Sequence, residues 1–241
     1  MRAVLTFHSI DDSGSMLSFA PARFAELIES LARSGVPVVA FDDLLRLREG
    51  IAITFDDGMA TLHRHALPVL HDHGFPAHLF LTTGAVGSDN MWPSQPRAAP
   101  HFDMLDWRQV EDCAAQGLLV ESHTATHPDL RTLDDARIVD ECRVADEEIE
   151  RRLGRRPRLF AYPYGFADER VRRVVAPLYA GCFSTRLDYL RDQADLSDLS
   201  DLPRLDTYFL RAPTLFRHLL SAPVHSYIGL RAAIRRIRGR T

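Results

Sequence analysis

The chain contains no lysine, so all 29 of its basic side chains are arginines. This absence excludes enzymes that form a Schiff base on lysine and nucleotide hydrolases that need the lysine of a phosphate-binding loop. Cysteine is scarce as well. The three cysteines, Cys113, Cys142 and Cys182, are scattered and lack C-x-x-C spacing. That pattern argues against a disulfide framework and a cysteine zinc site, and it fits a reducing compartment.

Long apolar runs are also missing, and no stretch approaches the roughly 20 residues that a membrane-spanning helix needs. Met1 and Arg2 lead directly into the short apolar run 3–7, without the apolar core and small-residue cleavage site of a secretory signal. From these two features and the cysteines, we expect a cytoplasmic protein. Its apolar fraction of 46% and charged fraction of 26% are ordinary for a globular domain.

Acidic residues are absent from the end of the chain. Seven arginines and no carboxylate side chains follow Asp206: Arg211, Arg217, Arg231, Arg235, Arg236, Arg238 and Arg240. Because the whole chain has a net charge of −4, the part up to Asp206 carries about −11. No nucleic-acid motif accompanies the arginines, so we do not expect a nucleic-acid partner.

The apolar residues of this arginine-rich end have near-helical spacing: Tyr227, Leu230, Ile234 and Ile237. The spacing predicts a basic amphipathic helix. Two interpretations remain open. The helix lies on an anionic membrane surface at the inner face of the membrane, or it packs on the rest of the protein and exposes its arginines.

Short apolar runs rich in β-branched residues alternate along the chain with segments of helical period. The predicted strands are residues 3–7, 36–40, 51–55, 77–81, 118–122, 159–162 and 179–184. Such alternation implies a parallel sheet with helices on its faces. About seven units favour a closed α/β barrel in a single domain over an open sheet.

Helix signals lie between these strands. Apolar residues recur at intervals of three and four after Pro21 and again before Gly74. Capping boxes starting at Asp106 and at Thr132 predict two more helices, the second ending at Gly154. The Pro-rich segment 84–103 is a long loop, a type that is usually functional or disordered. Residues 188–206 show no clear period and receive no assignment.

Polar or turn-forming residues follow four of the predicted strands. They are His8, Asp56-Asp57-Gly58, the segment from His123 to His127, and Pro163-Tyr164-Gly165. In a parallel α/β fold the carboxyl ends of the strands meet on one face, where active sites form. Each cluster taken singly is also explained as a turn or a helix cap. Their convergence at one end is what favours a site.

Two adjacent carboxylates repel each other unless a positive group holds them. One of Asp56 and Asp57 can bind a cation while the other stays free as a base. His123 and His127 supply two nitrogen ligands, and two histidines with one carboxylate are typical of a catalytic metal site with open positions. A cation there would polarise an acyl oxygen and acidify a water molecule.

Two segments resemble the signature motifs of a known family. Thr54-Phe55-Asp56-Asp57-Gly58 and Ser122-His123-Thr124-Ala125-Thr126-His127-Pro128 are similar to the first two motifs of the polysaccharide deacetylases (carbohydrate esterase family 4, the NodB-homology domain), and Phe160 to Gly165 resembles the third. The resemblance covers about residues 1–210 and implies a distorted (β/α)7-type barrel, with 211–241 as an arginine-rich helical extension.

The resemblance also implies roles for the site residues. Asp56 is the expected base, and the Tyr164 N–H stabilises the oxyanion. Asp57, His123 and His127 are the expected ligands of a divalent metal, with Zn²⁺ as the default and Co²⁺ or Ni²⁺ also suited to this ligand set. Trp92, Pro163 and Tyr164 are the predicted substrate contacts, and for Trp92 we weigh stacking on a sugar equally against anchoring its loop.

The sequence departs from the family pattern at two places. The third motif usually carries an arginine that orients the base, and Ala161 stands there instead. The family's Leu-x-x-His, whose histidine protonates the leaving amine, is missing. We propose His8 as the replacement acid, because some members resemble a rearranged version with this histidine at the N-terminus, and Arg204 as the replacement arginine. The alternative for His8 is a place in a turn.

The resemblance implies a metal-dependent de-N-acetylase acting on N-acetylhexosamine units of a glycan or glycolipid precursor, as in exopolysaccharide biosynthesis. The expected partner is an N-acetylated sugar polymer or a lipid-linked sugar. One alternative is a hydrolase of another amide, such as a formamido sugar or a cyclic ureide. The other is a glycan-binding module with impaired catalysis, which the two departures suggest.

Overall fold

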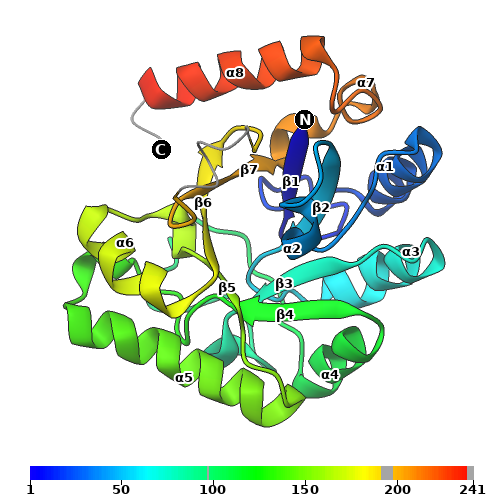
Figure 1. Cartoon of the computed structure of the whole chain (residues 1–241). Coiled ribbons are helices and arrows are strands. Elements are labelled where there is room, and N and C mark those ends of the chain that lie inside the picture. Colours follow the sequence, from blue (N-terminus) through cyan, green and yellow to red (C-terminus); the bar gives the residue numbers. More distant parts are fainter. Residues whose placement is uncertain (97, 191–197, 238–241) are drawn as a thin grey trace.

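Seven parallel strands form a closed barrel in the computed structural model, which describes residues 1–96, 98–190 and 198–237 (Figure 1). The strands are β1 (Arg2–Phe7), β2 (Gly50–Phe55), β3 (Ala77–Leu81), β4 (Leu118–Ser122), β5 (Leu159–Ala161), β6 (Gly181–Leu187) and β7 (Leu202–Asp206). They follow one another around the barrel in chain order, and β7 pairs with β1 to close it. The predicted single-domain (β/α)7-type barrel is confirmed.

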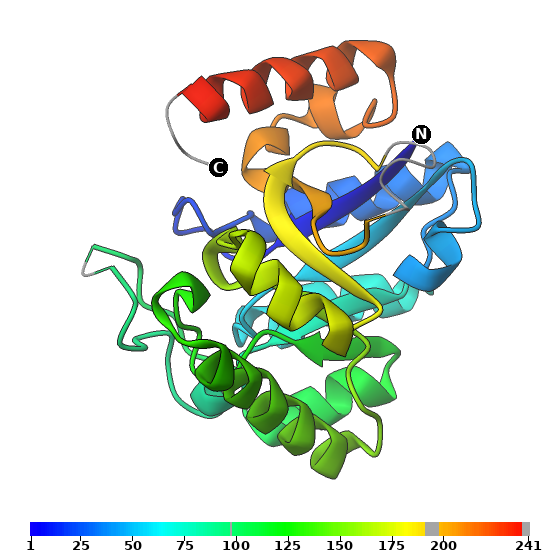
Figure 2. The same ribbon diagram turned by 60° about the vertical axis from the view of Figure 1, so that its left-hand side comes forward.

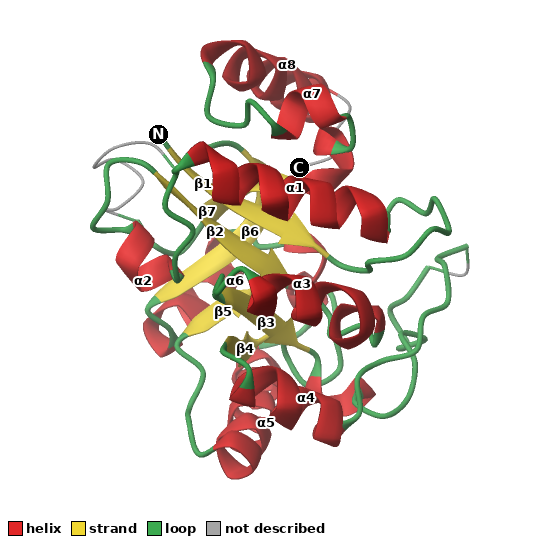
Figure 3. Cartoon of the chain, turned by 90° about the vertical axis from the view of Figure 1, so that its right-hand side faces the viewer, coloured by secondary structure: helices red, strands yellow, loops and turns green. Residues whose placement is uncertain are grey.

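Helices surround the barrel on its outside (Figure 3). They are α1 (Pro21–Ser34), α2 (Phe41–Leu44), α3 (Leu67–Asp72), α4 (Trp107–Ala115), α5 (Asp135–Leu153), α6 (Glu169–Val175), α7 (Pro213–Phe216) and α8 (Ala222–Ile237). The largest buried cluster joins outward side chains of β1 to β4 to α1, α3, α4 and α8, and a second cluster with Val4, Phe80 and Phe183 lies in the barrel interior. A third cluster packs β5 and β6 against α5 and α6, so the apolar core consists of separate clusters inside and outside the barrel.

All four predicted helices are present, with one correction, and the stripe before Gly74 lies in a π-helical turn (Leu62–Ala66) that continues into α3. Pro21 is the first residue of α1, and α1 buries the predicted apolar stripe. Asp106 and Gln109 form the capping box of α4. The predicted box at Thr132 is wrong, because the N-cap of α5 is Asp134, whose side chain accepts the Arg137 N–H. Helix α5 does end at Gly154, which adopts a left-handed conformation.

The strand prediction fails at two segments. Residues 36–40 form one isolated β-bridge, between Val38 and Ile51. This bridge lies beside the first half of β2, where β3 does not pair, because the pairing of β2 with β3 begins at Thr54. Helix α2 begins directly afterwards, so this segment does not continue as a barrel strand. Strand β7 was not predicted, because Pro203 and Arg204 break the apolar pattern of a buried strand.

Strands β4 and β5 are joined by one residue pair only, Ser122 with Phe160. The buried carboxylate of Glu121 supplements this pairing. It accepts the backbone N–H groups of Arg158, at 2.7 Å, and Leu159, at 3.0 Å, and it also pairs with the Arg155 guanidinium at 3.2 Å. Glu121 therefore holds the start of β5 against β4.

Replacing Glu121 by alanine should lower the free energy of unfolding by about 3 kcal/mol, because it leaves one buried and one part-buried N–H group without an acceptor. Urea denaturation monitored by circular dichroism measures this change. Glu150→Ala, which removes a half-exposed partner of Arg156, is the matched control and should cost well under 1 kcal/mol. Equal losses in the two variants would contradict this role for Glu121.

Helix α8 lies across one end of the molecule, over β6 and β7 (Figures 1 and 2). It packs on the core through Val224 and Ile228, whereas Leu230 and Ile237 are exposed by 61% and 86%. The buried face therefore differs from the predicted stripe, of which only Tyr227 packs against the core. Arg238 and Arg240 lie outside the described residues. Within the described part, no helix has the length and apolar character needed to cross a bilayer.

Candidate metal and catalytic site

The carboxyl ends of the barrel strands bring the predicted site residues together. Asp56 and Asp57 follow β2 directly, His123 follows β4, and His8 follows β1. Tyr164 lies in a short 3₁₀ turn (Pro163–Gly165) after β5. Asp56, Asp57 and His123 are all at most 4% exposed. A parallel barrel places such residues on one face, as the sequence predicted.

Asp57, His123 and His127 form a buried cluster whose candidate ligand atoms all lie within 4.8 Å of one another. The Asp57 Oδ1 atom is 3.3 Å from the Nε2 atom of each histidine. Burial by itself would raise the pKa of Asp57, but hydrogen bonds with the two histidines outweigh it and hold that pKa well below its ordinary value. The carboxylate is therefore ionised, as a metal ligand must be.

The two imidazoles suit a metal ion. His123 hydrogen-bonds through Nδ1 to the Ala161 carbonyl oxygen at 2.7 Å, which leaves Nε2 as the ring atom facing Asp57. This is the usual outer partner of a metal-binding histidine. Burial lowers the pKa of His127 and so favours the neutral imidazole that binds metals. Two nitrogens and one carboxylate oxygen match the donor set of Zn²⁺, Co²⁺ or Ni²⁺.

The backbone is strained around this cluster. Among the described residues, four that are not glycine have positive φ angles, and all four lie in the site: Asp57 (70°), Thr124 (68°), His127 (54°) and Tyr164 (59°). Such conformations cost energy and persist where the surrounding structure requires them. Gly58, with φ of 101°, follows Asp57 because a Cβ there would lie 2.5 Å from the Leu81 Cδ1 atom.

Asp56 forms a buried ion pair with Arg204 of β7. The Nη1 and Nη2 atoms of the arginine lie 2.6 and 2.7 Å from the two carboxylate oxygens, and the Nε–H donates to the Ser184 carbonyl oxygen at 3.2 Å. Burial would raise the pKa of Asp56, but the charges of Arg204 and then His123 outweigh it and lower that pKa below its ordinary value. The pair fixes the carboxylate in one orientation and keeps it ionised.

His8 lies on the other side of the same carboxylate. Its Nε2 atom is 4.0 Å from the Asp56 Oδ2 atom, and its side chain is 25% exposed. It is therefore more open to solvent than Asp56, whose side chain is 5% exposed. The structure thus places His8 and Arg204 beside Asp56. The roles predicted for them from the sequence are those of the proton donor and of the arginine that orients the base.

The long loop 84–106, which projects from the body in Figure 2, is anchored at the site. The Trp92 ring lies 4.2 Å from the His127 ring, and its Nε1–H donates to the Tyr164 hydroxyl at 3.0 Å. Trp92 is only 9% exposed. Through these contacts Trp92 anchors its loop to the site. The predicted stacking of Trp92 on a sugar stays a prediction. Pro163 is buried, so its predicted contact with substrate also stays a prediction.

Sequence reasoning missed two residues that position the ligands. The Ser94 hydroxyl donates to the His127 carbonyl oxygen at 2.6 Å and also hydrogen-bonds the Tyr164 hydroxyl. The Thr124 hydroxyl accepts the His127 N–H at 3.0 Å and so shapes the strained turn. Thr124 lies between the two predicted ligands, which is a signal that could have been used. Nothing in the sequence marks Ser94, which is 33 residues away from His127.

The chain is similar in sequence to a protein named for the polysaccharide deacetylases. This protein, YxkH of Bacillus subtilis (strain 168), is 24% identical over 174 residues, which are 69% of this chain and 57% of YxkH. The chain thus spans little more than half the length of that relative.

Two solved structures share the fold. IcaB from Ammonifex degensii has a TM-score of 0.73 at 23% identity, over 90% of this chain and 97% of its own. The Streptococcus pyogenes deacetylase PplD in complex with acetate has a TM-score of 0.72 at 20% identity, over 85% and 91%.

The family profile named "Polysaccharide deacetylase" matches residues 47–179, more than half of the chain. The matched region contains the candidate metal-ligand cluster, Asp56 and Tyr164, whereas His8, just after the first strand, and Arg204, on the last strand, lie outside it. Together with the barrel, this match shows that the chain belongs to the polysaccharide deacetylase family, whose members are hydrolases acting on carbon–nitrogen bonds other than peptide bonds.

Proposed function

We propose that this protein is a metal-dependent de-N-acetylase that hydrolyses the acetamido group of N-acetylhexosamine units in a glycan or glycolipid precursor. One observation carries the proposal. The cluster of Asp57, His123 and His127 lies directly beside a second carboxylate, Asp56, that Arg204 holds ionised. A metal site next to an oriented base is the arrangement that hydrolysis of an unactivated amide needs.

In this proposal Asp57, His123 and His127 hold the metal, with Zn²⁺ as the default. When bound, the metal polarises the amide carbonyl oxygen and lowers the pKa of water. Asp56 accepts a proton from the water that attacks the carbonyl carbon. The Tyr164 N–H, which has no hydrogen-bond partner among the described residues, is available to the oxyanion. The carbon–nitrogen bond then breaks, and His8 protonates the leaving amine.

Arg204 supports catalysis over the alternative of an impaired glycan-binding module. That alternative rested on the absent arginine of the third motif and the absent Leu-x-x-His. In this chain a guanidinium reaches Asp56 from β7 instead, and His8 reaches it from β1. Ala161, which replaces the motif arginine, contributes its carbonyl oxygen to His123.

The proton donor can be tested by replacing His8 with alanine. We expect kcat to fall about 10²-fold, because general acid catalysis of amine departure is lost. Bound metal should stay at the wild-type level, since His8 is not a ligand. His71→Ala, an exposed histidine at the end of α3, is the control and should keep wild-type turnover. An unchanged kcat in His8→Ala would refute the proposed role.

The reaction and substrate can be tested together by measuring acetate and formate release. The substrates are N-acetylglucosamine oligomers, lipid-linked N-acetylated sugars and a formamido sugar, each with the metal-loaded protein. The proposal expects acetate release from one of the N-acetylated sugars. Formate release without acetate release would support the alternative amide hydrolase, and metal binding without turnover of any substrate would support the glycan-binding module.

We also propose a peripheral contact of α8 with an anionic membrane, as a lipid-linked substrate would require. The exposed side chains of Leu230 and Ile237 and the arginines of the helix support it. The double variant Leu230→Gln/Ile237→Gln should lose cosedimentation with phosphatidylglycerol vesicles and keep its fold, since neither side chain is in the core. Wild-type protein that stays in the supernatant would contradict this contact. The cytoplasmic location stays a prediction.

A further inference from the structure

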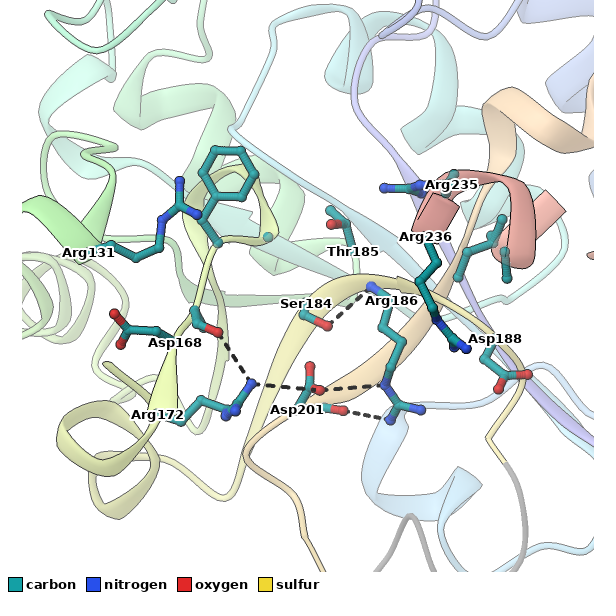
Figure 4. A pocket seen from close by; sticks show the side chains of 15 residues that line it. Arg131, Asp168, Arg172, Ser184, Thr185, Arg186, Asp188, Asp201, Arg235 and Arg236 are labelled. Atoms are coloured by element: carbon teal, nitrogen blue, oxygen red, sulfur yellow. Dashed lines mark hydrogen bonds and ion pairs between the residues drawn. The ribbon is translucent and has the colours of Figure 1, made fainter. Parts of the chain in front are cut away.

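A pocket of about 450 Å³ lies over β6, between α6 and α8 (Figure 4). Its size is in the range of small-molecule binding sites. The wall consists of the segment from Gly165 into α6, the outer part of β6 and the last turns of α8, with Arg131 and Asp201 contributed by the turns before α5 and β7. It includes five arginines, and we call it the arginine pocket: Arg131, Arg172, Arg186, Arg235 and Arg236.

The arginine pocket carries excess positive charge in an acidic protein. Three carboxylates, Asp168, Asp188 and Asp201, lie in its wall, and a fourth, Asp129, pairs with Arg131 from outside it, so these groups together have a net charge of +1, whereas the chain has −4. Arg172 and Arg186 share one carboxylate, that of Asp201, at 4.0 and 3.5 Å. Arginine side chains from four separate elements, the short turn 130–132, α6, β6 and α8, thus line one cavity (Figure 4).

The arginine pocket adjoins the catalytic loop. Gly165 and Phe166 in its wall directly follow Tyr164, whose N–H we assign to the oxyanion. Gly165 packs so closely on Thr185 that a side chain there would collide with it. Ser184, also in the wall, accepts the Nε–H of the arginine that holds Asp56. A substrate group bound in the pocket would therefore be tied to the same two segments that shape the catalytic centre.

We propose that the arginine pocket binds a phosphate or pyrophosphate group, and that this group belongs to a phosphate-linked amino sugar, the substrate of the catalytic centre. The second part rests on the proposed function. Arginine forks match phosphate oxygens in paired hydrogen bonds, and an uncharged glycan gives no reason for such a cluster. A phosphate held there would select glycolipid or nucleotide-type precursors over neutral N-acetylglucosamine polymers.

The first test measures binding of inorganic pyrophosphate by titration calorimetry. We expect the double variant Arg172→Gln/Arg236→Gln to bind at least about tenfold more weakly than the wild type, because each charge-assisted hydrogen bond is worth about that factor. Arg173→Gln changes an exposed arginine on the same helix, outside the pocket lining, and should bind as the wild type does. Equal affinities of the wild type and the double variant would overturn the proposal.

A further variant shows where the pyrophosphate binds. Because pyrophosphate also binds metals, His127→Ala, which lacks a metal ligand, should retain pyrophosphate binding. Loss of binding in His127→Ala together with full binding in the double variant would place the anion at the metal and overturn the proposal. Each variant's thermal unfolding is recorded, and the single variants Arg172→Gln and Arg236→Gln replace the double variant if it does not fold.

The second test asks whether the bound phosphate belongs to the sugar substrate or to a lipid surface. The KM for N-acetylglucosamine 1-phosphate should rise about tenfold or more in the double variant, with the KM for N-acetylglucosamine unchanged. If the arginines instead bind a lipid surface, the double variant would lose binding to phosphatidylglycerol vesicles. It would then keep the wild-type affinity for pyrophosphate and the wild-type KM values. That result would overturn the proposal. Failure of the proposed function is distinct, since the wild type would then hydrolyse neither sugar while still binding pyrophosphate.

Discussion

Replacing His127 by alanine is expected to abolish stoichiometric zinc binding and to lower kcat/KM by at least about 10³-fold. His127 Nε2 lies 3.3 Å from Asp57 Oδ1, so the variant removes one of the three candidate ligand atoms. The metal's stabilisation of negative charge on the reacting oxygen is worth several kcal/mol, and each 1.4 kcal/mol is a factor of ten in rate. Metal analysis of the purified variant and acetate release measure the two effects.

Two companion variants separate ligand loss from a damaged fold. Asp57→Asn keeps the shape of the side chain and should lose zinc and turnover as His127→Ala does. His101→Ala removes a histidine of loop 84–106 that is 57% exposed and paired with Asp89. It should retain both zinc and turnover. Zinc bound at the wild-type level in Asp57→Asn and His127→Ala would contradict the assignment of these ligands.

Replacing Arg204 by methionine is expected to lower kcat/KM by about 10²- to 10³-fold near neutral pH, because Asp56, the proposed base, loses its fixed orientation and part of its ionised fraction. The guanidinium makes two hydrogen bonds to Asp56 and is 2% exposed, so solvent does not take its place. Arg46→Met, which removes a largely exposed arginine, is the control and should leave the rate unchanged.

The dependence of kcat/KM on pH shows in which direction Arg204 shifts the pKa of Asp56. Burial raises the pKa of Asp56, and the charges of Arg204, His123 and His8 lower it to a net value below the ordinary one. Without Arg204 the pKa must rise, so a smaller fraction of Asp56 is ionised at a given acidic pH. The acidic limb of kcat/KM should therefore move to higher pH in Arg204→Met and less in Arg204→Lys, which keeps the charge. A limb that stays in place would mean that Arg204 does not act on Asp56.

Much of the barrel could be predicted from local pattern. The strands ending at Phe55, Leu81 and Ser122 are short apolar runs, and helices α1 and α4 carry a helical stripe and a start signal. Strand β7 could not be found in this way. Arg204 points to Asp56 inside the barrel, so the residue that serves the site is the same one that breaks the strand pattern.

The candidate site likewise contains residues that local sequence pattern predicts and residues that it does not. Asp56, Asp57, His123 and His127 stand in two short motifs, so their proximity follows from the parallel strands. The residues that orient them come from distant segments. The Ala161 carbonyl acts through the backbone and leaves no mark in the sequence, and Ser94 reaches His127 from a loop of no regular structure. Such contacts depend on tertiary packing, which local pattern does not encode.

The proposed function requires that the cluster of Asp57, His123 and His127 binds a metal on which amide hydrolysis depends. The most direct measurement is to strip the protein with a chelator and follow acetate release as Zn²⁺ is titrated back. Activity should be lost on stripping and should rise linearly to a plateau at one Zn²⁺ per chain, with one bound zinc by metal analysis. Full acetate release by the stripped protein, or no zinc bound at the plateau, would contradict this requirement.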